Sequence, residues 1–344
     1  NGLRQFREQA IVKTVFPILR LIFMFLFVLL GLKVFGSLLG TLIATILSIF
    51  LSVWLLKIPL PSTTQVSKFL PRDLLFFSVP IIIASLAMTV LRNINLLFIK
   101  SFLGDNTLVG LYTAALTISN LPYLIFLSLP ATLFPTISKS ASAGNENLTK
   151  KYIQQSLRYL LLLIVPITAL LSATSVEVLL LSYSSVYMSA APTLTLLIIS
   201  SAFLSFYATL CSIISGSGKP KMVMIITLFF VIILLILNIY FIPWGGIFGA
   251  AFTQLLMSFI AATWASLYVY AKFKVLLRLK STIKIMVSGL LVYSITTYWH
   301  YTGIYIVINY VLILLLYLLV LVLLGEIKKD DWEIIRKIFK KNER

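Results

Sequence analysis

Long apolar runs separated by short polar segments make up most of the chain. Ten of these runs approach or exceed the roughly 20 residues that an α-helix needs to cross about 30 Å of hydrocarbon. Inside lipid, every backbone polar group must be bonded within the protein, so each run predicts a transmembrane helix. The predicted spans are Ile11–Leu30, Ser37–Leu56, Leu74–Ile99, Val109–Ile137, Tyr152–Ser175, Ala190–Ser215, Met222–Ile242, Ile247–Tyr270, Ile283–Trp299 and Ile304–Leu324.

The distribution of lysine and arginine tests this number of spans. When the connections are assigned to alternating sides, 24 of the 28 basic residues fall on the side of the N-terminal segment. The other side receives only Lys33 and Lys100, while Arg20 and Arg92 lie inside spans. Loops rich in basic residues stay in the cytoplasm, and one missed helix would invert every later loop. We therefore predict ten spans, a cell-membrane location and cytoplasmic ends of this chain.

Composition agrees with lipid as the main solvent. The chain has 60% hydrophobic and 11% charged residues, whereas a soluble domain carries about 25% charged residues. The net charge of +18 follows from insertion topology. The sequence does not show the aromatic or helix-turn-helix pattern that accompanies a basic surface in nucleic-acid-binding proteins. Membrane lipids are therefore expected partners and nucleic acid is not.

Residues that could support catalysis or bind a metal are few. Cys211 is the single cysteine and lies in an apolar run, so it provides neither a disulfide framework nor a metal cluster. The single histidine, His300, lies in a short predicted outer turn without an acidic neighbour in sequence. We predict no enzyme activity, no catalytic residues, no metal and no cofactor.

The basic segment 328–344 has the spacing of an interfacial helix.

Two arginines inside spans are the most informative residues. A guanidinium at mid-membrane depth costs at least about 2.5–3.5 kcal/mol and must face protein, water or an anionic ligand. Arginine also binds phosphate oxygens through two parallel hydrogen bonds. Arg92 therefore predicts a contact with a pyrophosphate or an acidic sugar, and Asn95 shares its helix face. Arg20 lies nearer the cytoplasmic end of its span. Instead of binding a ligand, either arginine could bond a carbonyl group or extend its side chain to the membrane interface.

Uncharged polar residues complete the candidate binding set. Asn120 and Tyr112 could bond sugar hydroxyls, although such side chains also join membrane helices to each other. Asp105 and Glu177 fall at outer ends of spans, so the sequence offers no buried carboxylate for ion coupling. The prolines in the spans favour bending helices, as in a transporter, over a passive anchor.

Several motifs carry a resemblance to a known family. Gly216-Ser217-Gly218-Lys219-Pro220 predicts a tight cytoplasmic hairpin, and Ile242-Pro243-Trp244-Gly245-Gly246-Ile247-Phe248-Gly249-Ala250-Ala251 follows after one span. With the segment from Arg92 to Ala115 and the Pro135–Ser138 helix end, this ordered set resembles the polysaccharide-biosynthesis flippases. These belong to the multidrug/oligosaccharidyl-lipid/polysaccharide (MOP) exporter superfamily. The resemblance covers essentially the whole chain.

The resemblance implies an all-α polytopic membrane protein, a MATE-like two-bundle transporter lacking its first helices, about four in number. It places the end of the N-terminal bundle at 1–56, a cytoplasmic linker at 57–73, a six-helix C-terminal bundle at 74–270, two additional helices at 271–325 and a basic tail at 326–344. The family often carries Asp where this chain has Asn95, which puts ion coupling through that position in doubt.

The resemblance also implies the cargo and partners. The cargo would be a polyprenyl-(pyro)phosphate-linked oligosaccharide, flipped across the cytoplasmic membrane by alternating access for cell-surface polysaccharide biosynthesis. A glycan polymerase or transferase would be a protein partner. A MATE-type multidrug exporter and a lipid II or teichoic-acid flippase are the alternatives. Buried arginine without buried acid argues against export of cationic drugs.

Overall fold

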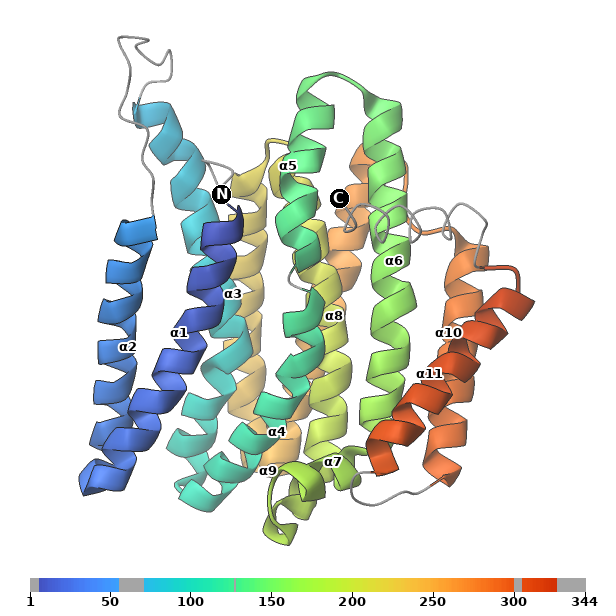
Figure 1. Ribbon diagram of the computed structural model, residues 1–344. Helices are drawn as coiled ribbons and strands as arrows, with labels where there is room; N and C mark the ends of the chain where they lie inside the picture. Colours follow the sequence, from blue (N-terminus) through green and yellow to red (C-terminus); the bar gives the residue numbers. More distant parts are fainter. Residues whose placement is uncertain (1–5, 56–70, 127, 300–304, 327–344) are drawn as a thin grey trace. The chain divides into compact units, whose positions relative to one another are not determined.

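The computed structural model describes residues 6–55, 71–126, 128–299 and 305–326, and every regular element in these ranges is helical (Figure 1). The all-α prediction is therefore confirmed. The elements are α1 (Phe6–Phe27), η1 (Val28–Leu32), α2 (Lys33–Leu55), α3 (Pro71–Leu103), α4 (Asn106–Phe126), α5 (Ser128–Ser142), α6 (Glu146–Ala173), α7 (Ser175–Ser182), η2 (Ser185–Ala190), α8 (Ala191–Gly216), α9 (Pro220–Phe273), α10 (Leu279–Tyr298) and α11 (Tyr305–Leu323).

Eight helical stretches among the described residues are long and apolar enough to cross a membrane, and two of them fold back on themselves. One is Ile11–Leu55, interrupted at Gly31 (φ 83°). The other is α9, whose 54 residues are interrupted at Gly246 (φ 55°), a conformation that glycine adopts without steric cost. Thr253 Oγ1 donates to Asn238 Oδ1 across this turn at 2.7 Å, so the two halves of α9 lie side by side. Counting each half separately agrees with the ten predicted spans.

The chain divides into two compact units, residues 1–68 and 69–344. In unit 1, a stripe of small residues on α2 packs against α1. A Cβ atom at Gly40 would lie 2.6 Å from the backbone nitrogen of Met24, so only glycine permits this approach. Close approach through small residues is typical of membrane helix pairs. The buried stripe consists of Gly36, Gly40, Ala44 and Ser48.

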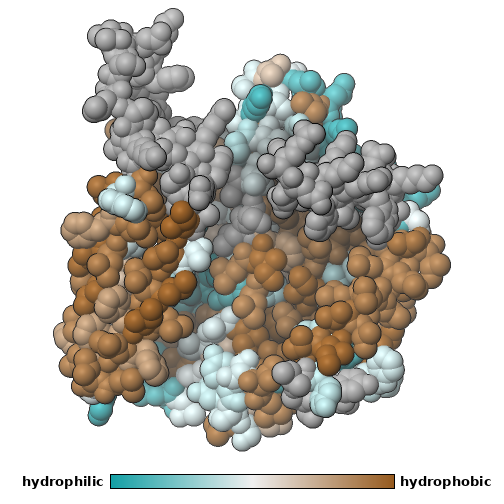
Figure 2. All heavy atoms as spheres, in the orientation of Figure 1, coloured by the Kyte–Doolittle hydropathy of each residue, from teal (hydrophilic) through white to brown (hydrophobic). Residues whose placement is uncertain are grey.

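In unit 2, α8 packs against α4, α5, α6 and α9. Its core contains the fully buried aromatic side chains of Tyr112, Tyr207 and Phe230. Figure 2 shows hydrophobic side chains over α1 and α2 of unit 1 and over α11 of unit 2, and hydrophilic side chains over the α5–α6 turn. Many leucine, isoleucine and phenylalanine side chains are exposed on this surface. Soluble proteins rarely expose such large apolar patches to water, so this surface is suited to contact with lipid.

The predicted fourth span, Val109–Ile137, covers α4, which is described up to Phe126, and α5, which is described from Ser128. Pro122 and Pro135 lie inside these helices, and proline removes a backbone hydrogen bond. The short elements α7 and η2 between α6 and α8 were not predicted. The predictions for His300, for residues 328–344 and for most of the 57–73 linker lie outside the described residues, and the remaining domain boundaries stay predictions.

An ion pair fixes the end of α11 within unit 2. Arg158 of α6 donates from Nε to Glu326 Oε1 at 2.8 Å and from Nη2 to the backbone oxygen of Glu326 at 2.6 Å. Ser281 of α10 donates to the same carboxylate. The side chains are 18% and 8% exposed, so both charges are shielded from solvent. Three helices, α6, α10 and α11, are thereby joined at one point.

Candidate functional site

Arg92 of α3 is held by two side chains of α4. Its Nη2 donates to Asn120 Oδ1 at 2.7 Å, and its guanidinium carbon lies 4.0 Å from the centre of the Tyr123 ring. Asn120 and Tyr123 are three residues apart and share one face of α4. The hydrogen bond and the cation–π contact together orient the guanidinium plane. Two of the predicted binding residues, Arg92 and Asn120, are thus in contact, and Tyr123 joins them.

A cavity of about 300 Å³ in unit 2 has Arg92 in its lining. Hydroxyl side chains from four helices line the same cavity, and none of its described lining residues is acidic. A guanidinium carries five N–H donors, and the bond to Asn120 uses one. The arrangement can therefore bind an anionic group beside hydroxyl-bearing chemistry. The lining includes Ser85 and Thr89 of α3, Tyr123 of α4, Cys211, Ser212 and Ser215 of α8, and Thr227 of α9.

Asn95, one turn further along α3, lies in a different environment. Its side chain is completely buried. Its Nδ2, which carries two hydrogens, lies within hydrogen-bond distance of three acceptors: Tyr112 Oη at 3.0 Å, the backbone oxygen of Ala250 at 2.9 Å and Gln254 Oε1 at 3.1 Å. Its Oδ1 accepts from Asn238 Nδ2 at 2.7 Å. The amide thereby connects α3 and α4 with both halves of α9.

The structure therefore divides the candidate residues into two groups. Arg92 borders the cavity and bonds Asn120, whereas Asn95 and the fully buried Tyr112 bond to other helices. A void of about 10 Å³, lined by Arg92, Asn120 and Gln254 among others, lies between the groups. Its volume is close to the minimum for one water molecule, about 10–15 Å³. Contact between cargo and Asn95 remains a prediction.

Replacing Asn95 with alanine is expected to destabilise the protein by about 1–2 kcal/mol. A buried polar atom left unpaired costs about 1–3 kcal/mol, although hydrogen bonds between membrane helices average only about 0.6 kcal/mol. Unfolding by sodium dodecyl sulfate in mixed micelles measures the change. Asn93→Ala is the matched control, because Asn93 is exposed and bonds Thr89 of its own helix. An equal effect of both substitutions would contradict the proposed structural role of Asn95.

The remaining candidate, Arg20, lies in unit 1 on an exposed face of α1. Its role in binding stays a prediction. Sequence reasoning missed Tyr123 and Cys211 in the Arg92 cavity. The three-residue spacing from Asn120 was an available signal for Tyr123. Cys211 had no such signal, because its place in the lining depends on how α8 packs.

Comparison with protein families gives two partial matches. Residues 1–141 match the family described as polysaccharide biosynthesis protein, and residues 80–240 match the MatE family. A stretch of 195 residues, 56% of this chain, is 27% identical to an uncharacterized membrane protein of Methanocaldococcus jannaschii. The match covers 38% of that protein.

Two solved structures have a similar fold. The lipid II flippase MurJ in an inward closed conformation superposes with a TM-score of 0.68 and 19% identity, over 90% of this chain and 66% of that chain. A multidrug resistance MATE family transporter of the MOP superfamily, in an outward-facing conformation, gives a TM-score of 0.61 and 15% identity over 77% of this chain and 62% of that one. The chain thus spans less than two thirds of the length of these relatives, and the likeness concerns the fold.

Proposed function

We propose that this chain, parts of which match the polysaccharide biosynthesis protein and MatE families, forms part of a flippase for polyprenyl-linked oligosaccharides. The observation that carries this proposal is the cavity around Arg92, where an oriented guanidinium faces space lined by hydroxyl groups. Phosphate or an acidic sugar is the anion that such a group prefers. The uncharged sugar units would bond the serine and threonine hydroxyls.

The proposed transport step is alternating access across the cytoplasmic membrane. The polyprenyl tail stays in the lipid, while the charged head crosses through the cavity. Arg92 offsets the negative charge of the head, which would otherwise cost several kcal/mol at mid-membrane depth. We propose that both ends of this chain lie in the cytoplasm. We also propose that a glycan polymerase or transferase receives the flipped cargo.

Two other cargoes are compatible with the fold. A lipid II flippase would use the same cation for a pyrophosphate, and only its glycan would differ. A multidrug exporter of cationic compounds would need acidic residues in its cavity, and the described lining of the Arg92 cavity contains none. The chemistry of the cavity therefore favours an anionic cargo over a cationic one.

Transport in proteoliposomes tests the proposal. The full-length protein is reconstituted with one of three fluorescent compounds: a polyprenyl-pyrophosphate oligosaccharide, lipid II or a cationic dye. We expect the oligosaccharide lipid to cross the bilayer. Its crossing is measured as a change in the fraction of fluorescence that a quencher added outside the vesicles removes. Movement of lipid II alone would assign that cargo instead. Movement of the dye alone, or of none of the three, would overturn the flippase proposal.

A further inference from the structure

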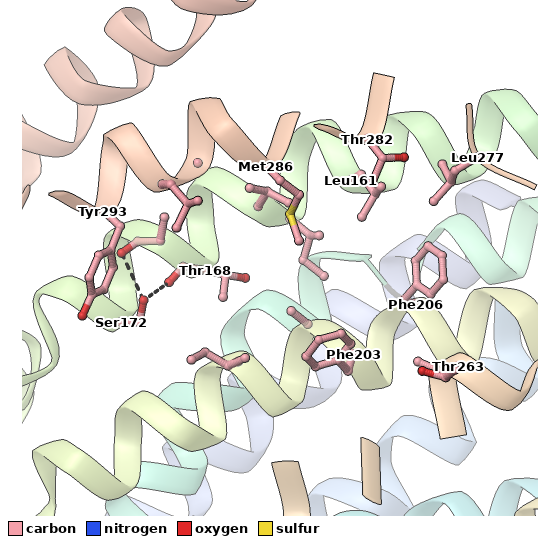
Figure 3. A pocket seen from close by; sticks show the side chains of 18 of the residues that line it. Leu161, Thr168, Ser172, Phe203, Phe206, Thr263, Leu277, Thr282, Met286 and Tyr293 are labelled. Atoms are coloured by element: carbon pink, nitrogen blue, oxygen red, sulfur yellow. Dashed lines mark hydrogen bonds between the residues drawn. The ribbon is translucent and has the colours of Figure 1, made fainter. Parts of the chain in front are cut away.

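A second and larger cavity, of about 570 Å³, lies in unit 2 between α6, α8, α9 and α10. Most of its lining is aliphatic or aromatic (Figure 3). Leu161 of α6, Phe203 of α8 and Met286 of α10 approach it from three walls. We call this cavity the α10 groove. Its apolar walls exclude a sugar head and suit a hydrocarbon chain.

The length of the α10 groove matches one leaflet of a bilayer. Along α10 it extends from Thr282 to Tyr293, which lie at opposite ends of the groove in Figure 3. Eleven residues of α-helix rise about 16 Å. The hydrocarbon core of a bilayer is about 30 Å thick, so one leaflet contributes about 15 Å. The groove therefore has the length of a phospholipid acyl chain.

One end of the α10 groove meets a group of cations. Leu277 and Thr282 line the groove, and the backbone oxygen of Arg278, between them, accepts a hydrogen bond from the nitrogen of Thr282 at 3.0 Å. Further lysines lie on the same connection and on the end of α9. We define the basic mouth of the groove as the exposed residues Lys272, Lys274, Arg278 and Lys280.

Among the described residues the cations of the basic mouth form no ion pair. The carboxylate of Glu326, which accepts from Ser281 beside Lys280, is paired with Arg158 instead. Between Glu177 and Glu326 the sequence contains seven basic residues and no acidic residue. Lys272 bonds Ser217 Oγ instead, at 2.6 Å. Close positive charges without counter-ions attract an anion from outside the chain.

We propose that the α10 groove binds an anionic glycerophospholipid of the cytoplasmic leaflet, with its acyl chain between α6, α8 and α10 and its phosphate at the basic mouth. The inference is independent of the transported cargo. Charge complementarity selects an anionic headgroup over a zwitterionic one, because each Lys or Arg near a charged membrane surface strengthens attraction about fivefold. The length of the groove selects a leaflet lipid. The bound lipid would connect α10 to the rest of unit 2.

Lipid titration of the purified full-length protein by native mass spectrometry tests the site. The probes are dioleoyl phosphatidylglycerol and dioleoyl phosphatidylcholine, which share their chains and differ in charge. We expect the anionic lipid to bind at least about tenfold more tightly, as expected for two or more favourable Lys or Arg contacts. Equal affinities would overturn the proposal. Polyprenyl phosphate is added as a competitor, and binding of polyprenyl phosphate without phosphatidylglycerol would assign the groove to the cargo.

Three variants separate the headgroup from the chain. Arg278→Ala with Lys280→Ala should weaken the anionic lipid about 5- to 25-fold and leave the zwitterionic lipid unchanged. Thr263→Trp fills the groove from an exposed position on α9 and should weaken both lipids. Lys139→Ala with Lys151→Ala removes two exposed cations away from the groove lining and should change neither. An equal loss in this control would show unspecific charge attraction and contradict the site.

Discussion

Replacing Arg92 with alanine is expected to weaken cargo binding about 10- to 100-fold, because a hydrogen bond to a charged group contributes about 1.5–3 kcal/mol. Transport of the oligosaccharide lipid in proteoliposomes, measured at several cargo concentrations, reports this loss as a raised apparent KM. Arg92→Lys keeps the charge, but it loses the paired hydrogen bonds and much of the contact with Tyr123, which lies 4.0 Å from the guanidinium carbon. Its transport should therefore be intermediate.

The control for this experiment lies on the same helix. Lys100 is exposed near the other end of α3 and bonds the turn at Gly104. Lys100→Ala should leave transport unchanged. Inhibition of transport by free pyrophosphate is a second measurement. It should weaken in Arg92→Ala if Arg92 binds the phosphate groups, and it should stay the same if Arg92 has only a structural role. Unchanged transport by Arg92→Ala, or an equal loss with Lys100→Ala, would remove Arg92 from the binding site.

Replacing Arg158 with alanine should produce the largest loss of stability, about 3–5 kcal/mol, because it leaves a buried carboxylate without its partner. Glu326 is 8% exposed, and its carboxylate and its backbone oxygen both accept hydrogen bonds from Arg158. The free energy of unfolding in mixed micelles measures the effect. Glu326→Gln should cost less, because the neutral amide oxygen still accepts from Arg158.

A double-mutant cycle isolates the ion pair itself. The cycle consists of Arg158→Met, Glu326→Leu and the double variant. The double variant removes both charges and should be more stable than Arg158→Met alone, because no buried charge then lacks a partner. The exposed pair Lys150 and Glu146, 3.4 Å apart, provides the comparison, and Lys150→Ala should change stability by less than about 1 kcal/mol. A similar cost for Lys150→Ala and Arg158→Ala would show that burial does not set the strength of these pairs.

Features set by local sequence were predictable. Length and hydropathy located the spans, and the asymmetry of basic residues gave their number. The glycine-rich segment at Gly245 and Gly246 indicated the turn that divides α9, and the structure places a positive φ there. The family resemblance, read from such motifs, is confirmed by the two family matches.

Features set by contacts between distant residues were not predictable. Asn95 bonds Ala250 and Gln254, which are 155 and 159 residues away, so a single sequence could not distinguish its buried environment from that of Arg92. Arg158 and Glu326 are 168 residues apart, and each looked like an ordinary charge near the interface.

The single cysteine of these 344 residues lies in the lining of the Arg92 cavity. A thiol-reactive fluorophore or spin label therefore has the half-buried Cys211 as its single target in these residues, with no other cysteine to remove first. Its rate of labelling from either face of a sealed vesicle would report which face the cavity opens to. The native chain thus contains its own reporter of conformational state, at the position where the anionic group of the cargo is proposed to bind.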